Sequence, residues 1–97
     1  MLVVKTYAVD IDGTLCVERR EWWLYAQAKP IPESIKKINR LKQQGHTIIL
    51  YTSRFEEDRA VTTRWLKKHG VQYDKIVFNK LRADHYVDNN SLRMGDL

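Results

Sequence analysis

The chain has 97 residues, which is enough for one domain with a modest core and excludes two separate cores. Hydrophobic residues make up 43% of the chain and charged residues 30%, an ordinary globular composition that excludes a largely disordered protein. The formal net charge of +5 favours anionic partners, either phosphorylated small molecules or nucleic acid.

Apolar and helical patterns alternate along the chain and predict its elements. Proline at position 32 suits the first turn of a helix. The continuous apolar run near position 49 suits a strand buried on both faces of a parallel sheet. In chain order we expect a strand at 2–9, a helix from 32 to 45, a strand at 47–51, a helix at 56–69, a strand at 75–78 and a short strand at 85–87.

Strands that alternate with helices predict right-handed βαβ units. The expected fold class is therefore α/β, a three-layer Rossmann-like parallel sheet with strand order about 3-2-1-4. Residues 15–29 fit neither pattern and are expected to form a flap. We expect residues 1–97 to form a single domain.

Cysteine content and hydropathy bear on the compartment. Cys16 is the only cysteine, so an internal disulfide is excluded and a cytoplasmic location is the default expectation. A packing role is favoured over a nucleophilic one for Cys16, because no catalytic cysteine motif surrounds it. The apolar run at 2–9 carries Lys5 and is too short for a signal sequence or a membrane span, so no membrane partner is expected.

The most informative motif follows the first predicted strand and reads Asp10-Ile11-Asp12-Gly13-Thr14. Residues i and i+2 of a strand point to the same side, so Asp10 and Asp12 can face one point beyond the sheet edge. Two carboxylates this close repel each other unless a cation relieves them, and Mg²⁺ is the natural partner of oxygen ligands. Gly13 permits a sharp turn whose amides can form an anion-binding nest. An ordinary Asp-Gly turn is the alternative.

Polar residues also follow each of the other predicted strands. In a parallel sheet the carboxyl ends of the strands share one edge, where ligands bind. We therefore expect one composite site at this edge, built from Asp10 and Asp12 together with Thr52, Ser53, Arg54, Asn79, Lys80, Asp88 and Asn89.

This set of motifs resembles the haloacid dehalogenase (HAD) superfamily of phosphohydrolases. Asp-x-Asp-Gly-Thr matches the first family motif, and an apolar strand ending in Thr52 matches the second. Lys80 matches the third, and Tyr86-Val87-Asp88 matches the fourth. The chain looks more narrowly like small capless members, including phosphatases of capsule and surface-polysaccharide sugar metabolism. A looser similarity connects it to the phosphatase modules of polynucleotide kinase-phosphatases.

The resemblance implies a role for each matching residue. Asp10 would be the nucleophile that forms an aspartyl-phosphate, and Asp12 the general acid and base. Mg²⁺ would be held by Asp10, Asp12 and Asp88. The phosphate group would be bound by Gly13, Thr14, Thr52, Ser53 and Lys80.

Two features depart from the family pattern. Members often have a second acid after the fourth-motif aspartate, where this chain has Asn89, which could act in the second coordination shell of the metal. The gaps after Asp12 and after Tyr51 are too short for a cap domain. The site would then be covered by the 15–29 flap, by a second copy of the chain in a homo-oligomer, or by the substrate.

Two groups of residues have open alternatives. Arg54 could bind an anionic substrate, or pair with one of the acids at 56–58. The segment with Arg19, Arg20, Trp22 and Trp23 could contact substrate, although at least one of the tryptophans is expected to pack on the core.

Three functions are compatible with these patterns. The first is a Mg²⁺-dependent phosphomonoester hydrolase acting on a small phosphorylated metabolite, such as a sugar phosphate. The second is a polynucleotide 3′-phosphatase, because the charge is positive and the site open. The third is a phosphate- or metal-binding regulatory domain without turnover, because Asn89 replaces an acid.

Overall fold

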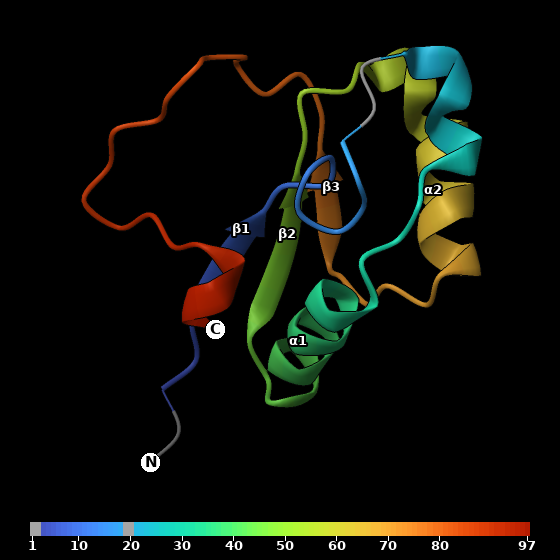
Figure 1. Ribbon diagram of the computed structural model, residues 1–97. Helices are drawn as coiled ribbons and strands as arrows, with labels where there is room; N and C mark the ends of the chain where they lie inside the picture. Colours follow the sequence, from blue (N-terminus) through green and yellow to red (C-terminus); the bar gives the residue numbers. More distant parts are fainter. Residues whose placement is uncertain (1–2, 19–20) are drawn as a thin grey trace.

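The computed structural model describes residues 3–18 and 21–97 (Figure 1). Each strand before the last is followed by a helix, as the alternating pattern predicts. The elements are β1 (Thr6–Val9), the 3₁₀ helix η1 (Trp22–Gln27), α1 (Pro32–Gln43), β2 (Thr47–Tyr51), the 3₁₀ helix η2 (Glu56–Asp58), α2 (Arg59–Lys68), β3 (Lys75–Val77) and the 3₁₀ helix η3 (Met94–Asp96).

The three strands form one parallel sheet in the order β1-β2-β3. The register pairs Val9 with Leu50 and Leu50 with Ile76, so the central strand β2 is bonded on both sides. Ile48 and Leu50 of β2 are fully buried, as expected for a strand in the middle of a parallel sheet. The α/β class and the 3-2-1 part of the expected strand order are confirmed.

Both crossovers of the sheet step in the same direction, from β1 to β2 and from β2 to β3. Right-handed crossovers that step the same way place their helices on the same face. Figure 1 accordingly shows α1 and α2 on one side of the strands. The described residues thus form two of the three expected layers.

The expected fourth strand at 85–87 is not formed in the structure, which corrects that prediction. Val87 is 95% exposed and pairs with no strand. The Tyr86 hydroxyl donates to the Leu81 carbonyl and accepts from the Ala83 amide, at 3.3 Å for the latter. These contacts close a local loop that competes with an extended strand, and three residues alone offer few ladder bonds in return. Strand β1 is therefore an edge strand in the described chain.

The core lies between the sheet and the two α-helices. Its fully buried members come from the loop after β1, from α1, from β2 and from α2. The C-terminal turn η3 is joined to this body, because Met94 packs against the core and its carbonyl accepts from Lys37 Nζ at 3.2 Å. The C-terminal turn is thereby fixed to the core and to α1.

Candidate active site

The loop after β1 has a fixed backbone. Gly13 adopts φ +81°, a left-handed conformation that favours glycine. The Ile11 carbonyl accepts from the amides of Thr14, Leu15 and Cys16, at 3.1, 2.8 and 3.3 Å. The Gly13 amide donates to the Cys16 carbonyl at 2.8 Å. The Gly13 and Thr14 amides therefore have partners within the loop, which corrects the expectation that they form a free anion nest.

Two other amides at this edge are available for an anion. In the part of the chain that the structure describes, the backbone N–H groups of Asp12 and Ser53 have no hydrogen-bond partner. An unpaired amide donor near a carboxylate-rich edge is suited to a phosphoryl oxygen. The Ser53 amide agrees with the sequence prediction, whereas the Asp12 amide was not among the predicted phosphate ligands.

Asp10 lies at the end of β1 and is partly buried. Its Oδ1 accepts from the Ile11 amide at 2.8 Å. Burial raises the pKa of the Asp10 carboxyl, the Ile11 hydrogen bond and the Lys80 charge lower it, and Asp12 and Glu18 raise it again. Because the net shift is upward, a cation or an extra donor beside Asp10 would stabilise its charged form.

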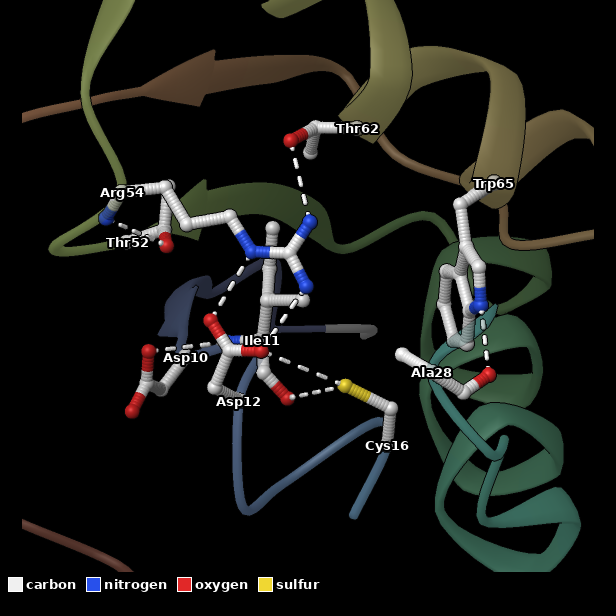
Figure 2. Close-up of polar contacts among 9 residues, drawn as sticks. All are labelled: Asp10, Ile11, Asp12, Cys16, Ala28, Thr52, Arg54, Thr62 and Trp65. Carbon is white, nitrogen blue, oxygen red and sulfur yellow. Dashed lines mark hydrogen bonds and ion pairs between the residues drawn. The ribbon is translucent and has the colours of Figure 1, made fainter. Parts of the chain in front are cut away.

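Asp12 is bound by a buried arginine from the loop after β2 (Figure 2). Arg54 donates from Nε to Asp12 Oδ2 at 2.9 Å and from Nη2 to Asp12 Oδ1 at 2.8 Å. Its Nη1 donates to Thr62 Oγ1 at 3.0 Å, and its guanidinium carbon lies 3.8 Å from the ring centroid of Tyr25. The expected ion pair of Arg54 with an acid at 56–58 is thus wrong, because the carboxylate that it binds is that of Asp12.

The ends of β2 and β3 meet the same edge. Thr52 is fully buried, and its Oγ1 accepts from the Arg54 amide at 3.1 Å. The Lys80 amide donates to the Thr52 carbonyl at 2.9 Å, which fixes the start of the loop after β3. The Lys80 ammonium lies 5.3 Å from the Tyr51 ring centroid and 4.5 Å from that of Tyr86. Lys80 is also close enough to Asp10 for its positive charge to lower the pKa of the Asp10 carboxyl.

A pocket of about 410 Å³ opens at this edge. It brings together three regions far apart in sequence, the loops after β1, β2 and β3. Its lining residues are Asp10, Asp12, Glu18, Ser53, Arg82, Ala83, Asp84 and Tyr86.

Four polar residues of this pocket were not predicted as site residues: Glu18, Arg82, Asp84 and Tyr86. Glu18 also lies near Gly13, with its Cβ 3.8 Å from where a Cβ at that glycine would be. The signal that could have identified Arg82 and Asp84 is their place directly after Lys80, in a loop that leaves the carboxyl end of a strand.

Asp88 and Asn89 lie outside this pocket. Both are exposed, and Asp88 Oδ2 accepts from the Ser91 hydroxyl at 3.2 Å. Within residues 3–18 and 21–97, no three Asp, Glu, His or Cys side chains gather closely enough to hold a metal ion. The reason is the missing fourth strand, which would have carried Asp88 to the sheet edge.

The flap also differs from its expectation. Arg19 and Arg20 lie outside the described residues. Trp22 and Trp23 are each 63% exposed and contact each other edge to face, with ring centroids 5.7 Å apart. Neither tryptophan packs on the core, because the buried aromatic of this segment is Tyr25, which covers Arg54.

The fold and site together define a class. A parallel α/β sheet whose first strand ends in Asp-x-Asp-Gly-Thr, with threonine and lysine after the next strands, is the arrangement of HAD-like phosphohydrolases. The family that matches residues 18–90 is the HAD superfamily, subfamily IIIB (acid phosphatase). This match covers more than half of the chain and begins after the Asp10–Thr14 motif.

Solved structures share the fold. A crystal structure of a structural-genomics target from Vibrio cholerae has a TM-score of 0.80 and 27% identity, covering 96% of this chain and 86% of that chain. The Pnkp1/Rnl/Hen1 complex has a TM-score of 0.67 and 27% identity, covering 89% of this chain and 30% of that chain. D,D-heptose 1,7-bisphosphate phosphatase from B. bronchiseptica, complexed with magnesium and phosphate, has a TM-score of 0.62 and 19% identity, covering 91% and 54%. No curated protein matches the chain.

The chain belongs to the HAD superfamily, subfamily IIIB (acid phosphatase). It is therefore a phosphatase, a hydrolase that acts on phosphoric monoesters. This assignment disfavours a regulatory domain without turnover. In the described ranges, no helix has the length and apolar character needed to cross a membrane.

Proposed function

We propose that the protein is a Mg²⁺-dependent phosphomonoester hydrolase that works through an aspartyl-phosphate on Asp10, with a small phosphorylated metabolite such as a sugar phosphate as substrate. The observation that carries this proposal is the pocket at the sheet edge, which Asp10 and Asp12 line together with Arg82 and Tyr86. A concave site of about 410 Å³ has room for a phosphorylated sugar. The aromatic ring of Tyr86 is suited to pack against the face of a sugar ring.

The reaction has two steps in which this chain's residues act. In the first, a carboxylate oxygen of Asp10 attacks phosphorus, the ester P–O bond breaks, and the leaving oxygen takes a proton from Asp12. In the second, a water gives its proton to Asp12 and attacks the same phosphorus. The bond to Asp10 then breaks, which releases phosphate and restores both carboxyl groups.

Several donors can hold the phosphoryl group. The unpaired amides of Asp12 and Ser53 and the ammonium of Lys80 would bind its oxygens, which carry the negative charge of the transition state. The Thr52 hydroxyl oxygen accepts from the Arg54 amide, so its hydrogen can be donated to another oxygen. Under this proposal Gly13 and Thr14 shape the loop, and their amides do not bind the phosphate directly.

The donor types of the pocket suit a hard cation, although no three acidic side chains of the described residues are close enough together to hold one without movement. Four carboxylates line it, from Asp10, Asp12, Glu18 and Asp84, against the single arginine Arg82. Oxygen donors in this excess suit Mg²⁺. When bound, Mg²⁺ would neutralise charge on the phosphoryl group. We propose Asp10 and the Asp12 backbone carbonyl as its ligands, with Asp88 and, in the second shell, Asn89 joining them if the loop at 81–93 closes onto the edge.

The direct test compares wild type with Asp10→Asn on p-nitrophenyl phosphate in the presence of Mg²⁺. We expect the variant to lose at least about 10³-fold in kcat, because no carboxylate remains to accept the phosphoryl group. Trapping with a denaturant during turnover should give a phosphorylated wild-type chain and an unmodified variant by mass spectrometry. Equal rates for the two proteins would contradict the proposal, and EDTA should reduce the wild-type rate.

A polynucleotide 3′-phosphatase is the second candidate function. It is supported by the net charge of +5 and by the 27% identity to a chain of the Pnkp1/Rnl/Hen1 complex. Phosphate release from a 3′-phosphorylated oligonucleotide is expected to fall steeply with salt if nucleic acid is the substrate. A set of sugar phosphates assayed beside it separates the two candidates, because only one class should show a high kcat/KM.

A further inference from the structure

The buried guanidinium of Arg54 has its donors directed at the protein itself. Nε and Nη2 bind the two oxygens of Asp12, and Nη1 binds Thr62 Oγ1. One face of the group lies over the Tyr25 ring, and the Arg54 side chain has no exposed surface. An arginine held in this way is poorly placed to bind substrate, because it would have to break three hydrogen bonds and leave a buried site.

We propose that Arg54 is a positioning residue that holds Asp12 for proton transfer, and that Asp12 Oδ2 is the oxygen that exchanges the proton. This inference rests on the proposed function. The planar fork of an arginine binds both oxygens of a carboxylate at once and therefore fixes the plane of that carboxylate. A lysine or an asparagine at this position could fix only one oxygen.

The choice of oxygen follows from the unequal surroundings of the two. Asp12 Oδ1 accepts from Arg54 Nη2 and lies 3.5 Å from the Cys16 thiol, whose single hydrogen can be donated to it or to the Ile11 carbonyl at 3.7 Å. Among the described residues, Asp12 Oδ2 accepts from Arg54 Nε alone. A carboxylate oxygen has two lone-pair positions, so Oδ2 keeps one for a proton. The Asp12 side chain is 16% exposed, which leaves it reachable from the pocket.

The consequence is specific to the leaving group. When the ester P–O bond breaks, an alkoxide needs the proton from Asp12 Oδ2, whereas p-nitrophenolate leaves without one. A misplaced Asp12 should therefore slow the transfer of the phosphoryl group from alkyl esters much more than from aryl esters. A loss that reflected only a damaged fold would reduce both reactions by the same factor.

The test measures kcat/KM of Arg54→Met for p-nitrophenyl phosphate and for an alkyl monoester such as propyl phosphate. Methionine keeps an unbranched side chain of similar reach and removes the fork. Because a positioned general acid contributes about 10²–10⁴-fold, we expect the alkyl ester to lose about 10²-fold or more and the aryl ester less than about tenfold. Arg54→Lys should restore the alkyl reaction in part. Equal losses for the two esters would overturn the inference.

Matched variants keep the result interpretable. Arg59→Met makes the same change at an exposed arginine and should leave both esters unchanged. Thr62→Val removes only the Nη1 partner and should give a smaller loss of the same kind; it decides the question if Arg54→Met does not fold. Asp12→Asn tests the acid role of Asp12 separately from the positioning role of Arg54. If Asp12→Asn slows only the alkyl ester and the Arg54 and Thr62 variants do not, the positioning role fails; if Asp12→Asn itself shows no preference, the acid role of Asp12 fails.

Discussion

Asp10 and Asp12 stand two residues apart but have different surroundings. Asp10 accepts one backbone hydrogen bond and faces the pocket with a pKa raised by burial, whereas Asp12 is bound at both oxygens by Arg54. The proposed nucleophile is Asp10, whose Oδ2 accepts no hydrogen bond from the described residues. The proposed acid and base is Asp12, whose carboxylate plane is fixed by the arginine. The division of roles that the family resemblance implies thus has a local physical basis.

Cys16 provides a prediction about alkaline stability. The thiol is fully buried, and burial raises its pKa from 9.0 to about 12. A thiol whose pKa is raised in the folded state stabilises the fold below pH 9, and this contribution is lost as the pH rises from 9 toward 12. Cys16 should therefore lower the free energy of unfolding by about 1.4 kcal/mol per pH unit over that range.

The measurement is urea unfolding of wild type and Cys16→Ala at pH 8, 9.5 and 10.5. Alanine removes the titrating group, so its curve isolates the cysteine from the tyrosines and lysines that titrate nearby. We expect the difference in unfolding free energy between the two proteins to shrink as the pH rises. A constant difference across the three pH values would show that the thiol does not titrate differently in the folded chain.

At the scale of elements, the contact between α2 and the segment before α1 holds the site together. Trp65 of α2 is buried and donates from Nε1 to the Ala28 carbonyl at 2.8 Å. Tyr25, in η1 just before Ala28, covers the Arg54 guanidinium. The buried residues Tyr25 and Ala28 therefore hold this segment beside the arginine site, whereas Trp22 and Trp23 are among its exposed residues.

Trp65→Phe tests this contact. The phenylalanine keeps most of the packing but removes the indole donor, which leaves a buried carbonyl without its partner. We expect a loss of about 1–3 kcal/mol in the free energy of unfolding, measured with urea. Trp22→Phe makes the same change at an exposed position and should stay within about 0.5 kcal/mol of wild type. Similar effects for the two variants would argue that Trp65 does not anchor the segment.

At the scale of the whole molecule, the central strand of the sheet and the loop after β3 differ in how firmly their backbones are held. β2 is bonded to both neighbours, whereas residues 81–93 are all exposed and lie apart from the strands (Figure 1). We therefore expect amide exchange to be slowest in β2 and fastest in 81–93. Hydrogen exchange followed by mass spectrometry measures both in one experiment.

The same measurement tests how the metal site is completed. If Asp88 joins the site, adding Mg²⁺ and beryllium fluoride, a phosphoryl mimic, should slow exchange in 81–93. Asp88→Asn should lose this slowing, while Asp84→Asn should keep it. The reverse pattern would assign the acidic partner to Asp84, which already lines the pocket. A homo-oligomer that covers the site would be detected separately, by light scattering with and without the ligands.

Much of the fold was predictable because local patterns determine it. The helix beginning at Pro32 and the strand at Thr47–Tyr51 agree with the structure, since periodicity and end signals act over a few neighbouring residues. The helix expected at 56–69 begins as the 3₁₀ turn η2 before α2, a difference confined to its first turn. The fourth strand was wrong because a short edge strand depends on long-range pairing, and the Tyr86 hydroxyl has local partners instead.

By itself, the sequence determined the α/β class, the parallel 3-2-1 order and the acidic loop at the end of the first strand, because hydrophobic period and motif spacing are properties of neighbouring residues. Only the tertiary structure decided the partner of Arg54, which is 42 residues from Asp12 in sequence. It also decided that Arg82 and Asp84 line the pocket while Asp88 lies outside it. Which side chains meet across two loops depends on how the whole chain packs, and no local pattern encodes that.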